Sequence, residues 1–344
     1  MKSFHAVFSK TQANLAIFCC LAMVSCNQQK DFPGTRSDLE KLGLKGKVKS
    51  LTETTYKGVR SMGENSQRDP EIRESVFFNE KGNITGKIYH FYSSGFTSRT
   101  TCEYDRNGNL TEEKILNDKG EELQRTTCWY DEKGRITERI KTDFKMISQN
   151  IEVFRYDENG RETERKNREY RAGGRIITYV PGPAEQKPEV QRDEGKDVWI
   201  TVTSGYDDKG NKTEEKYYSS DGRLRSRDTF RYDDKGRIIE ASSYNSDDIL
   251  RWVSSFKYDS NGNLLEKWGG DSLSGLRLER SCSYDNMGNI IRDVYYYQKW
   301  QSGTDMNYTY DADGNWITKT LNFFSETPEN IYTVSVKERA IEYY

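Results

Sequence analysis

The sequence has few histidines and no clusters of cysteine and histidine, the residues on which many catalytic and metal sites depend. It has two histidines in 344 residues, His5 and His90, and His5 falls in the leader described below. A histidine-based triad would have to centre on His90, where no neighbouring motif supports one. Cysteine and histidine are also not clustered at the short spacings of a zinc site. The sequence therefore predicts a protein that is not an enzyme and carries no metal and no cofactor.

Hydrophobic content is low as well, and the chain has no excess of positive charge. Hydrophobic residues make up 33% of the chain and charged residues 31%, whereas an ordinary domain has about 45–50% apolar residues. The 53 lysines and arginines against 55 aspartates and glutamates argue against a nucleic-acid partner, which usually requires a basic surface. Because the chain also has 23 Tyr, 14 Phe and 6 Trp, we expect an elongated fold with a thin core rather than disorder.

Residues 1–25 have the composition of a lipoprotein signal peptide. Two lysines carry the only formal charges there, Leu15 to Val24 is almost wholly apolar, and Ser25 is small, as in secretory leaders. The apolar run is too short for a membrane span, which needs about 20 residues, and no later segment approaches that length.

The end of this leader resembles the lipobox of bacterial lipoproteins, in Leu21-Ala22-Met23-Val24-Ser25-Cys26. In that family the cysteine becomes the new N-terminus and carries the lipid. The resemblance implies a lipid anchor on Cys26, attachment to a membrane, and a tether over residues 26–45. Asn27 stands where an aspartate is associated with inner-membrane retention, which implies the outer membrane, on its periplasmic or cell-surface face. The alternative is a chance cysteine beside an ordinary cleavage site.

A short motif, Tyr-Asp-x-x-Gly, recurs through the rest of the chain. Its copies begin at Tyr104, Tyr130, Tyr156, Tyr206, Tyr232, Tyr258, Tyr284 and Tyr310. Every interval is 26 residues except the interval of 50 after Tyr156, and a degenerate copy begins at Phe78. We interpret the long interval as hiding a further unit, with a loop near 179–197 and a turn at Pro181-Gly182-Pro183. Residues 46–344 would then form one domain of about ten units.

Each 26-residue unit contains two turns, which leaves two strands of about 7–9 residues rich in Thr, Ile, Tyr, Val and Phe. Asp caps the first turn and Gly takes its positive φ. The predicted fold class is all-β: tandem antiparallel β-hairpin repeats of 26 residues forming an elongated, curling single-layer meander sheet. Before it, residues 37–42 are expected to form one helical turn. Residues 45–48 and 336–339 are expected to be terminal strands that cap the array.

The alternation of residues predicts which side chains share a face. The residue two before each Tyr should lie on the Tyr face. The glutamates four residues after the turn Gly should lie there too and accept hydrogen bonds from the Tyr hydroxyls; they are Glu112, Glu138, Glu164, Glu214, Glu240 and Glu266. Cys102 and Cys128 occupy equivalent positions two strands apart, at about 9.6 Å, which is too far for a disulfide.

These units resemble the YD repeats of RHS-type and related bacterial surface proteins and toxins, over roughly residues 72–315. The resemblance implies hairpins in a long curling sheet that can wrap a cargo, with the eight motif tyrosines in structural roles. The chain departs from the family because it ends about 30 residues after the last turn, without a large C-terminal toxin domain.

Four tryptophans are the candidate ligand-binding residues: Trp252, Trp268, Trp300 and Trp316. We expect Trp252 and Trp268 to lie diagonally on one face, where an exposed aromatic platform would stack on a sugar or peptide; alternatively these rings fill the apolar stripe. Asp105, Asn107 and Asn109 are spaced like a calcium loop, but they are also ordinary turn formers, and no bidentate glutamate follows.

The favoured function is a non-enzymatic, lipid-anchored envelope or surface protein that acts as a binding scaffold for glycan, peptidoglycan or protein. A first alternative is a structural partner in an outer-membrane protein complex. A second is a glycoside hydrolase built on a pair of carboxylates. The repeated glutamates argue against the hydrolase. A catalytic residue occurs once in a chain, whereas a residue that recurs from unit to unit has a structural role in the repeat.

Overall fold

The computed structural model describes residues 37–56, 69–170, 199–297, 300–325 and 333–344. It contains one short helix within these ranges, α2 (Asp38–Lys41), and twenty strands. The strands are β1 (Val48–Tyr56), β2 (Pro70–Phe78), β3 (Ile84–Phe91), β4 (Thr97–Tyr104), β5 (Leu110–Asn117), β6 (Glu122–Tyr130), β7 (Ile136–Asp143), β8 (Ser148–Tyr156), β9 (Glu162–Tyr170), β10 (Trp199–Tyr206), β11 (Lys212–Tyr218), β12 (Leu224–Tyr232), β13 (Ile238–Asn245), β14 (Leu250–Tyr258), β15 (Leu264–Gly270), β16 (Arg277–Tyr284), β17 (Ile290–Tyr296), β18 (Gln301–Tyr310), β19 (Trp316–Ser325) and β20 (Thr333–Tyr343).

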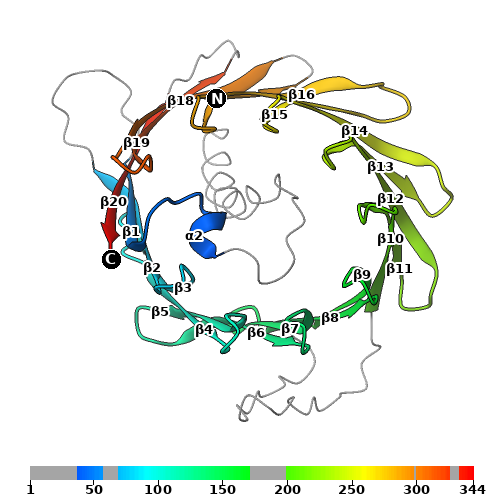
Figure 1. Cartoon of the computed structure of the whole chain (residues 1–344), viewed down its shortest axis with the longest axis horizontal. Helices are drawn as coiled ribbons and strands as arrows, with labels where there is room; N and C mark the ends of the chain where they lie inside the picture. Colours follow the sequence, from blue (N-terminus) through cyan, green and yellow to red (C-terminus); the bar gives the residue numbers. More distant parts are fainter. Residues whose placement is uncertain (1–36, 57–68, 171–198, 298–299, 326–332) are drawn as a thin grey trace, which may run out of the picture. The chain divides into compact units, whose positions relative to one another are not determined.

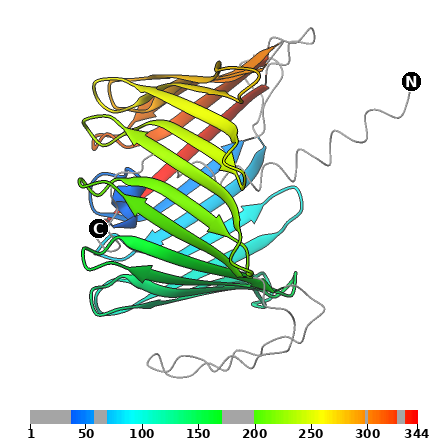
Figure 2. The ribbon, with the colours of Figure 1, turned by 90° about the vertical axis from the view of Figure 1, so that its right-hand side faces the viewer.

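Each strand pairs antiparallel with the next one along the chain, and β20 pairs with β1. The sheet is therefore a closed 20-stranded barrel (Figures 1 and 2). The predicted all-β meander of hairpins is confirmed, but the curling sheet that was expected to be elongated is closed into a ring. An open meander leaves an unpaired strand at each end, and the twist of successive strands lets those two edges meet and satisfy one another.

The Tyr-Asp-x-x-Gly motif forms the turn that sequence analysis predicts. At the first full copy, Asp105 N–H donates to Asn109 O at 2.9 Å, and Gly108, at φ +87°, donates to Asp105 O at 3.1 Å. The Asp105 carboxylate accepts the N–H groups of Asn107 and Asn109 at 2.9 and 2.8 Å. Aspartate therefore supplies the acceptor that the tight turn needs, and glycine supplies the positive φ.

A β-bulge follows every such turn. Tyr104 pairs with Leu110, but the preceding residue Glu103 pairs with Glu112, so Thr111 is an extra residue. The same register shift occurs in all nine hairpins that carry the motif or its degenerate copy. One extra residue moves every later side chain of the strand to the other face. The predicted Tyr–Glu hydrogen bonds are therefore wrong, because the repeated glutamates lie on the opposite face from the tyrosines.

The tyrosine hydroxyls instead bond to the main chain of the preceding unit. Tyr232 Oη donates to Lys212 O at 2.7 Å, twenty residues earlier. Equivalent bonds are made by Tyr104, Tyr130, Tyr156, Tyr206, Tyr258 and Tyr284. At the last copy the Tyr310 hydroxyl donates to the Asp285 carboxylate instead, and the Tyr308 hydroxyl donates to the carbonyl of Ile290. The motif tyrosines thus form a ladder that joins each hairpin to the next, as their predicted structural role requires.

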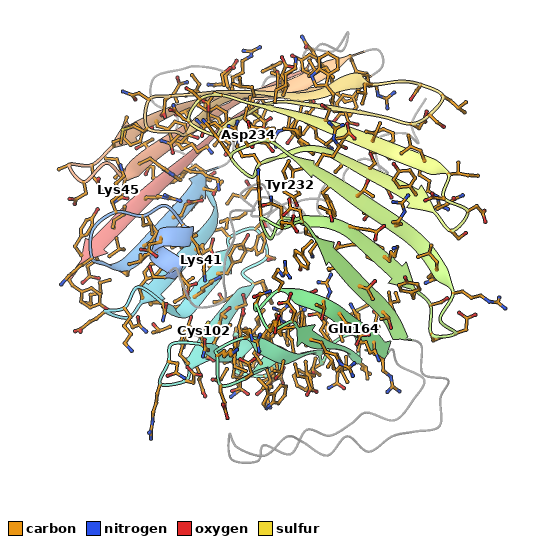
Figure 3. All side chains as sticks on the ribbon, turned by 45° about the vertical axis from the view of Figure 1, so that its right-hand side comes forward. Lys41, Lys45, Cys102, Glu164, Tyr232 and Asp234 are labelled. Carbon is orange, nitrogen blue, oxygen red and sulfur yellow. The ribbon has the colours of Figure 1, made fainter. Side chains whose placement is uncertain are left out.

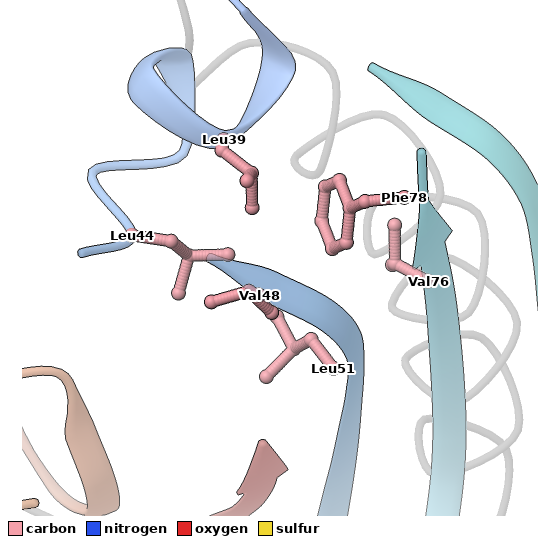
Figure 4. Close-up of a cluster of buried hydrophobic side chains, with 6 residues drawn as sticks. All are labelled: Leu39, Leu44, Val48, Leu51, Val76 and Phe78. Atoms are coloured by element: carbon pink, nitrogen blue, oxygen red, sulfur yellow. The ribbon is translucent and has the colours of Figure 1, made fainter. Parts of the chain in front are cut away.

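The tyrosine side of the sheet is its inner face. Helix α2 lies inside the ring (Figure 1), and its Asp38 accepts hydrogen bonds from Tyr104 Oη at 3.1 Å and Ile84 N–H at 2.8 Å. Ser37 caps the helix through a capping box with Glu40, which confirms the predicted helical turn. The largest buried cluster is Leu39, Leu44, Val48, Leu51, Val76 and Phe78 (Figure 4).

The last of the ten turns is assembled from the two ends of the described chain. Tyr343 pairs with Val48, and Tyr344 N–H donates to Lys47 O at 2.9 Å, which reproduces the bond that closes the other turns. Gly46, at φ +80°, takes the place of the turn glycine. The predicted caps therefore belong to two strands, β1 and β20, that pair with each other instead of covering the ends of an array.

The interval of 50 residues supplies one strand pair to the described sheet, because β9 pairs directly with β10. The sequence Pro181-Gly182-Pro183 lies outside the described residues. Ten hairpins are nevertheless present, because β20 and β1 supply the tenth.

Cys102, Cys128 and Cys282 are free, so the predicted absence of a bond between Cys102 and Cys128 is confirmed. All three lie on the inner face, two residues before a motif tyrosine. Burial raises the pKa of the Cys282 thiol to about 11, so these thiols behave as small buried side chains.

We predict that Tyr232→Phe lowers the free energy of unfolding by about 1–2 kcal/mol, because it leaves the half-buried Lys212 carbonyl without its donor. Tyr218→Phe is the control: Tyr218 lies on the other face, and its hydroxyl makes no hydrogen bond within the described residues. Urea denaturation of both variants measures the difference. Equal effects would show that the ladder does not stabilise the ring.

The turn aspartates predict loss of stability in acid. Burial by itself raises the pKa of Asp233, but hydrogen bonds from the N–H and guanidinium of Arg237 outweigh it and lower the pKa. A lowered folded-state pKa gives stability that is present above the unfolded value, near pH 4, and lost as the pH falls through the folded value. Thermal unfolding from pH 7 to pH 2.5 should therefore depend less on pH in Asp233→Asn. Asp234→Asn is the control, because the neighbouring Asp234 side chain makes no hydrogen bond in the described region. Its thermal unfolding should depend on pH as that of the wild type does.

Candidate functional site

The outer face of the wall carries the six repeated glutamates, and at least five of them contact a basic residue on the same or a neighbouring strand. Glu214 contacts Lys216 at 2.7 Å and Arg227 at 3.5 Å, and Glu266 contacts Lys257 at 2.7 Å. Similar pairs involve Glu112, Glu164 and Glu240. Charged side chains therefore cover the outside of the ring, and Figure 3 shows side chains on both sides of the ribbon.

A second charged column lies on the inner face, five residues after each turn glycine, because the bulge turns that position inward. It consists of Lys87, Glu113, Arg139, Arg165, Glu215, Ala241, Lys267, Asp293 and Lys319. Sequence analysis missed this column because it assumed unbroken alternation. The signal was available, since the position is charged in eight of nine copies.

Several members of the inner column have a partner on the neighbouring strand. Arg139 contacts Glu152 at 3.0 Å, and Lys267 contacts Glu279 at 3.0 Å. Asp293 accepts two hydrogen bonds from Arg280, at 2.8 and 2.9 Å. Each of these charges is compensated within one strand spacing, which is what half-buried ions require.

The balance of positive and negative side chains on the inner face differs where β20 pairs with β1 and the ring closes. The seam cluster consists of five inner-face residues: Glu53 on β1, Glu74 on β2, Lys319 on β19, and Lys337 and Arg339 on β20. Lys319 pairs directly with Lys337 across the strands. Arg339 pairs with Glu53, which in turn pairs with Glu74. Three cations and two carboxylates thus meet across four strands, and this cluster is the candidate functional site.

The two carboxylates of the seam cluster have opposite pKa shifts. Burial favours the neutral form of Glu53, but Lys337 and Arg339 outweigh it and lower its pKa; their nitrogens lie 2.7 and 3.1 Å from its oxygens. Burial raises the pKa of Glu74, and the charge of Glu53 adds to this. Glu53 therefore serves as the shared counter-ion of the two β20 cations.

Lys319 is the uncompensated member. In the part of the chain that the structure describes it makes no ion pair, and its Nζ lies 5.2 Å from the centre of the Tyr308 ring. Burial, followed by the charge of Lys337, lowers its pKa to about 8, while Glu53 acts in the opposite direction. A half-buried ammonium group beside two other cations is costly to fold around unless an anion joins it.

Aromatic rings border the seam cluster. Trp316 lies on the inner face opposite Tyr310, 6.1 Å from the Tyr308 ring, and the Arg339 guanidinium covers it at 3.4 Å from the ring centre. One of the four candidate tryptophans is therefore part of this site, but its ring is stacked on a cation, which leaves less of it for a ligand.

The other three candidates do not join Trp316. Trp252 pairs with Ser243 on the inner face, whereas Trp268 pairs with Ser255 on the outer face and donates to Glu266 at 2.8 Å. The expectation that these two rings share a face is wrong, because the bulge in β15 separates them. Trp300 stacks on Tyr297 at 3.8 Å between ring centres, between β17 and β18, and is 40% exposed.

Several predicted features lie outside the described residues: the signal peptide, Cys26, the tether up to residue 36, and the loop near 179–197. Among the described residues, no group of three or more His, Cys, Asp or Glu side chains is arranged to hold a metal ion. The helix in the described ranges is too short and polar to cross a membrane.

No family model matches the chain, and no significant match was found among curated proteins. Among solved structures it is similar to a porin-like protein from Bacteroides uniformis, with a TM-score of 0.34 and 11% identity over 86% of this chain and 98% of that one. A porin-like protein from Bacteroides vulgatus gives 0.31 and 13%, with the same coverage. The TcdB2-TccC3-Cdc42 structure gives 0.24 and 11% over 76% of this chain and 19% of that one. TM-scores this low carry no argument about function.

We predict that Lys319→Met stabilises the protein at pH 7 by about 1–3 kcal/mol, because it removes a buried charge whose pKa is lowered to about 8. The wild type carries this penalty below pH 8 and loses it as the pH rises towards the ordinary lysine value of 10.5. Denaturant unfolding at pH 7 and pH 10 should show the two proteins converging at the higher pH. An unchanged difference would place the Lys319 amine in water.

Proposed function

We propose that the protein is a non-enzymatic, lipid-anchored envelope protein whose closed sheet serves as a binding scaffold. The observation that carries this proposal is the charge on both faces of the wall. A sheet that faces lipid needs an apolar outer band, and one lysine or arginine at its middle costs about 2–4 kcal/mol. The outer pairs such as Glu214 with Arg227, and Glu266 with Lys257, instead suit a wall with water on both sides.

In this proposal the lipid on Cys26 attaches the protein to the outer membrane, and the ring itself offers its surfaces to a ligand. The inner face combines tyrosine and tryptophan rings with charged side chains, a composition suited to a glycan, a peptidoglycan fragment or a peptide. Hydrolysis is disfavoured at the seam cluster, because Glu53 is held by two cations and is not free to act as nucleophile or base.

One observation favours the alternative of a structural partner in an envelope complex. Three of the most exposed apolar side chains lie at hairpin ends opposite the Tyr-Asp turns, each in a separate turn. Leu273 is 96% exposed, Met146 69% and Ile249 59%. Protruding apolar groups of this kind mark contact surfaces, so this rim is where a partner protein would bind.

We expect Cys26→Ala to move the protein from the membrane fraction to the soluble fraction of the envelope without unfolding it, because residue 26 precedes α2 and the first strand of the described sheet, β1. Cell fractionation with immunodetection measures this, and near-ultraviolet circular dichroism checks the fold. The matched control is Cys102→Ala, which should stay with the membrane. Retention of Cys26→Ala in the membrane fraction would contradict the lipid anchor. If the retained Cys26→Ala protein is then released from the membrane by the additional change Leu273→Ser, the alternative of a partner complex is favoured.

A further inference from the structure

We infer that the seam cluster is an anion-binding site, in which Lys319 receives the carboxylate or phosphate group of a ligand on the inner face of the ring. The inference rests on the proposed binding role and names the chemical class of its ligand. Its basis is a comparison between equivalent positions of the repeat, since the same column that carries Lys319 also carries cations with their own acidic partners.

Lys267 is the repeat equivalent of Lys319, because both follow their turn glycine by five residues. Both side chains lie on the inner face, opposite Phe256 and Tyr308 respectively. Lys267 has Glu279 at 3.0 Å, whereas Lys319 has no ion-pair partner within the described residues. Sequence position and fold are therefore matched, and the counter-ion is the difference.

The carboxylates near Lys319 are already committed. Glu53 is bonded to both Lys337 and Arg339, and Asp293 is bonded through both oxygens to Arg280. Glu74 lies on β2, which is separated from β19 by β20 and β1, and burial raises the pKa of its carboxyl group. Neither Glu53 nor Asp293 can turn to Lys319 without leaving another buried cation unpaired, which is strongly destabilising.

The geometry leaves the Lys319 ammonium as the available donor. Arg339 is fixed between Glu53 and the Trp316 ring, and Lys337 is held by Glu53 at 2.7 Å. An ammonium group has three N–H donors, and Lys319 rests against the Tyr308 ring, which accepts none of them as a full hydrogen bond. One anionic group with two or three oxygens would satisfy these donors and reduce the repulsion from Lys337.

The test is a titration of the full chain, purified in detergent and labelled with ¹³C at the lysine ε carbons, followed by NMR at pH 7. Glucuronate is the carboxylate probe, inorganic phosphate is the phosphate probe, and glucose is the neutral control. The Lys319 resonance should shift with one or both anions and not with glucose. The anion that binds more tightly identifies the source of the charge.

Three variants make the assignment specific. Measured by isothermal titration calorimetry, which does not need the Lys319 resonance, Lys319→Met should weaken binding at least tenfold, and Lys319→Arg should retain it, because a charged donor remains. Lys267→Met should change it less than twofold. If Lys267→Met weakens binding as much as Lys319→Met, the effect is a general response to charge and the inference is overturned.

A pH titration gives a second readout. Binding requires the charged form of Lys319, so affinity should fall as the pH rises past 8, and bound anion should move the lysine's own titration upward. The groups that face this amine and set its titration are Lys337, Arg339, Glu53, Asp293 and Tyr308. If neither anion shifts the resonance, no anion site exists, whether or not Cys26 anchors the protein, because the measurement is made in solution.

Discussion

The one residue inserted after each Tyr-Asp turn determines most of the structure. Tyr104 faces Leu110, and Thr111 is extra, so Glu112 points outward and Glu113 inward. A bulge at this place bends the strand and increases its twist, and here it recurs once per hairpin at the same end of the sheet. The same insertion that helps the meander curl into a ring therefore also decides which charges line its inside.

The local features of the fold were predictable from sequence because they depend on neighbouring residues. Aspartate and glycine three positions apart specify the turn, and the 26-residue spacing specifies two strands per unit. The bulge was not predicted, since two-residue alternation was extended through it, and the glutamates and Trp268 were assigned to the wrong face. Closure was not predicted either, because the pairing of Val48 with Tyr343 depends on the summed twist of all the strands between them.

The seam cluster illustrates the same limit. Glu53 and Arg339 are separated by almost the entire repeat domain, and only the pairing of β1 with β20 brings them together. The charged column that contains Lys319 could have been found in the sequence by aligning units on their glycines. Its missing counter-ion could not, because that depends on which acids the neighbouring strands present, such as Glu279 beside Lys267.

The turn shared by Gly46 and Tyr344 has a consequence for how such proteins diversify. The tenth turn is formed by residues 46–48 and 343–344, whereas the other nine hairpins share the same turn and the same bulge and are therefore structurally equivalent. Loss or duplication of a 26-residue segment in the gene would change the ring by two strands and leave the tenth turn as it is. The number of units then sets the diameter of the ring, which grows with the number of strands.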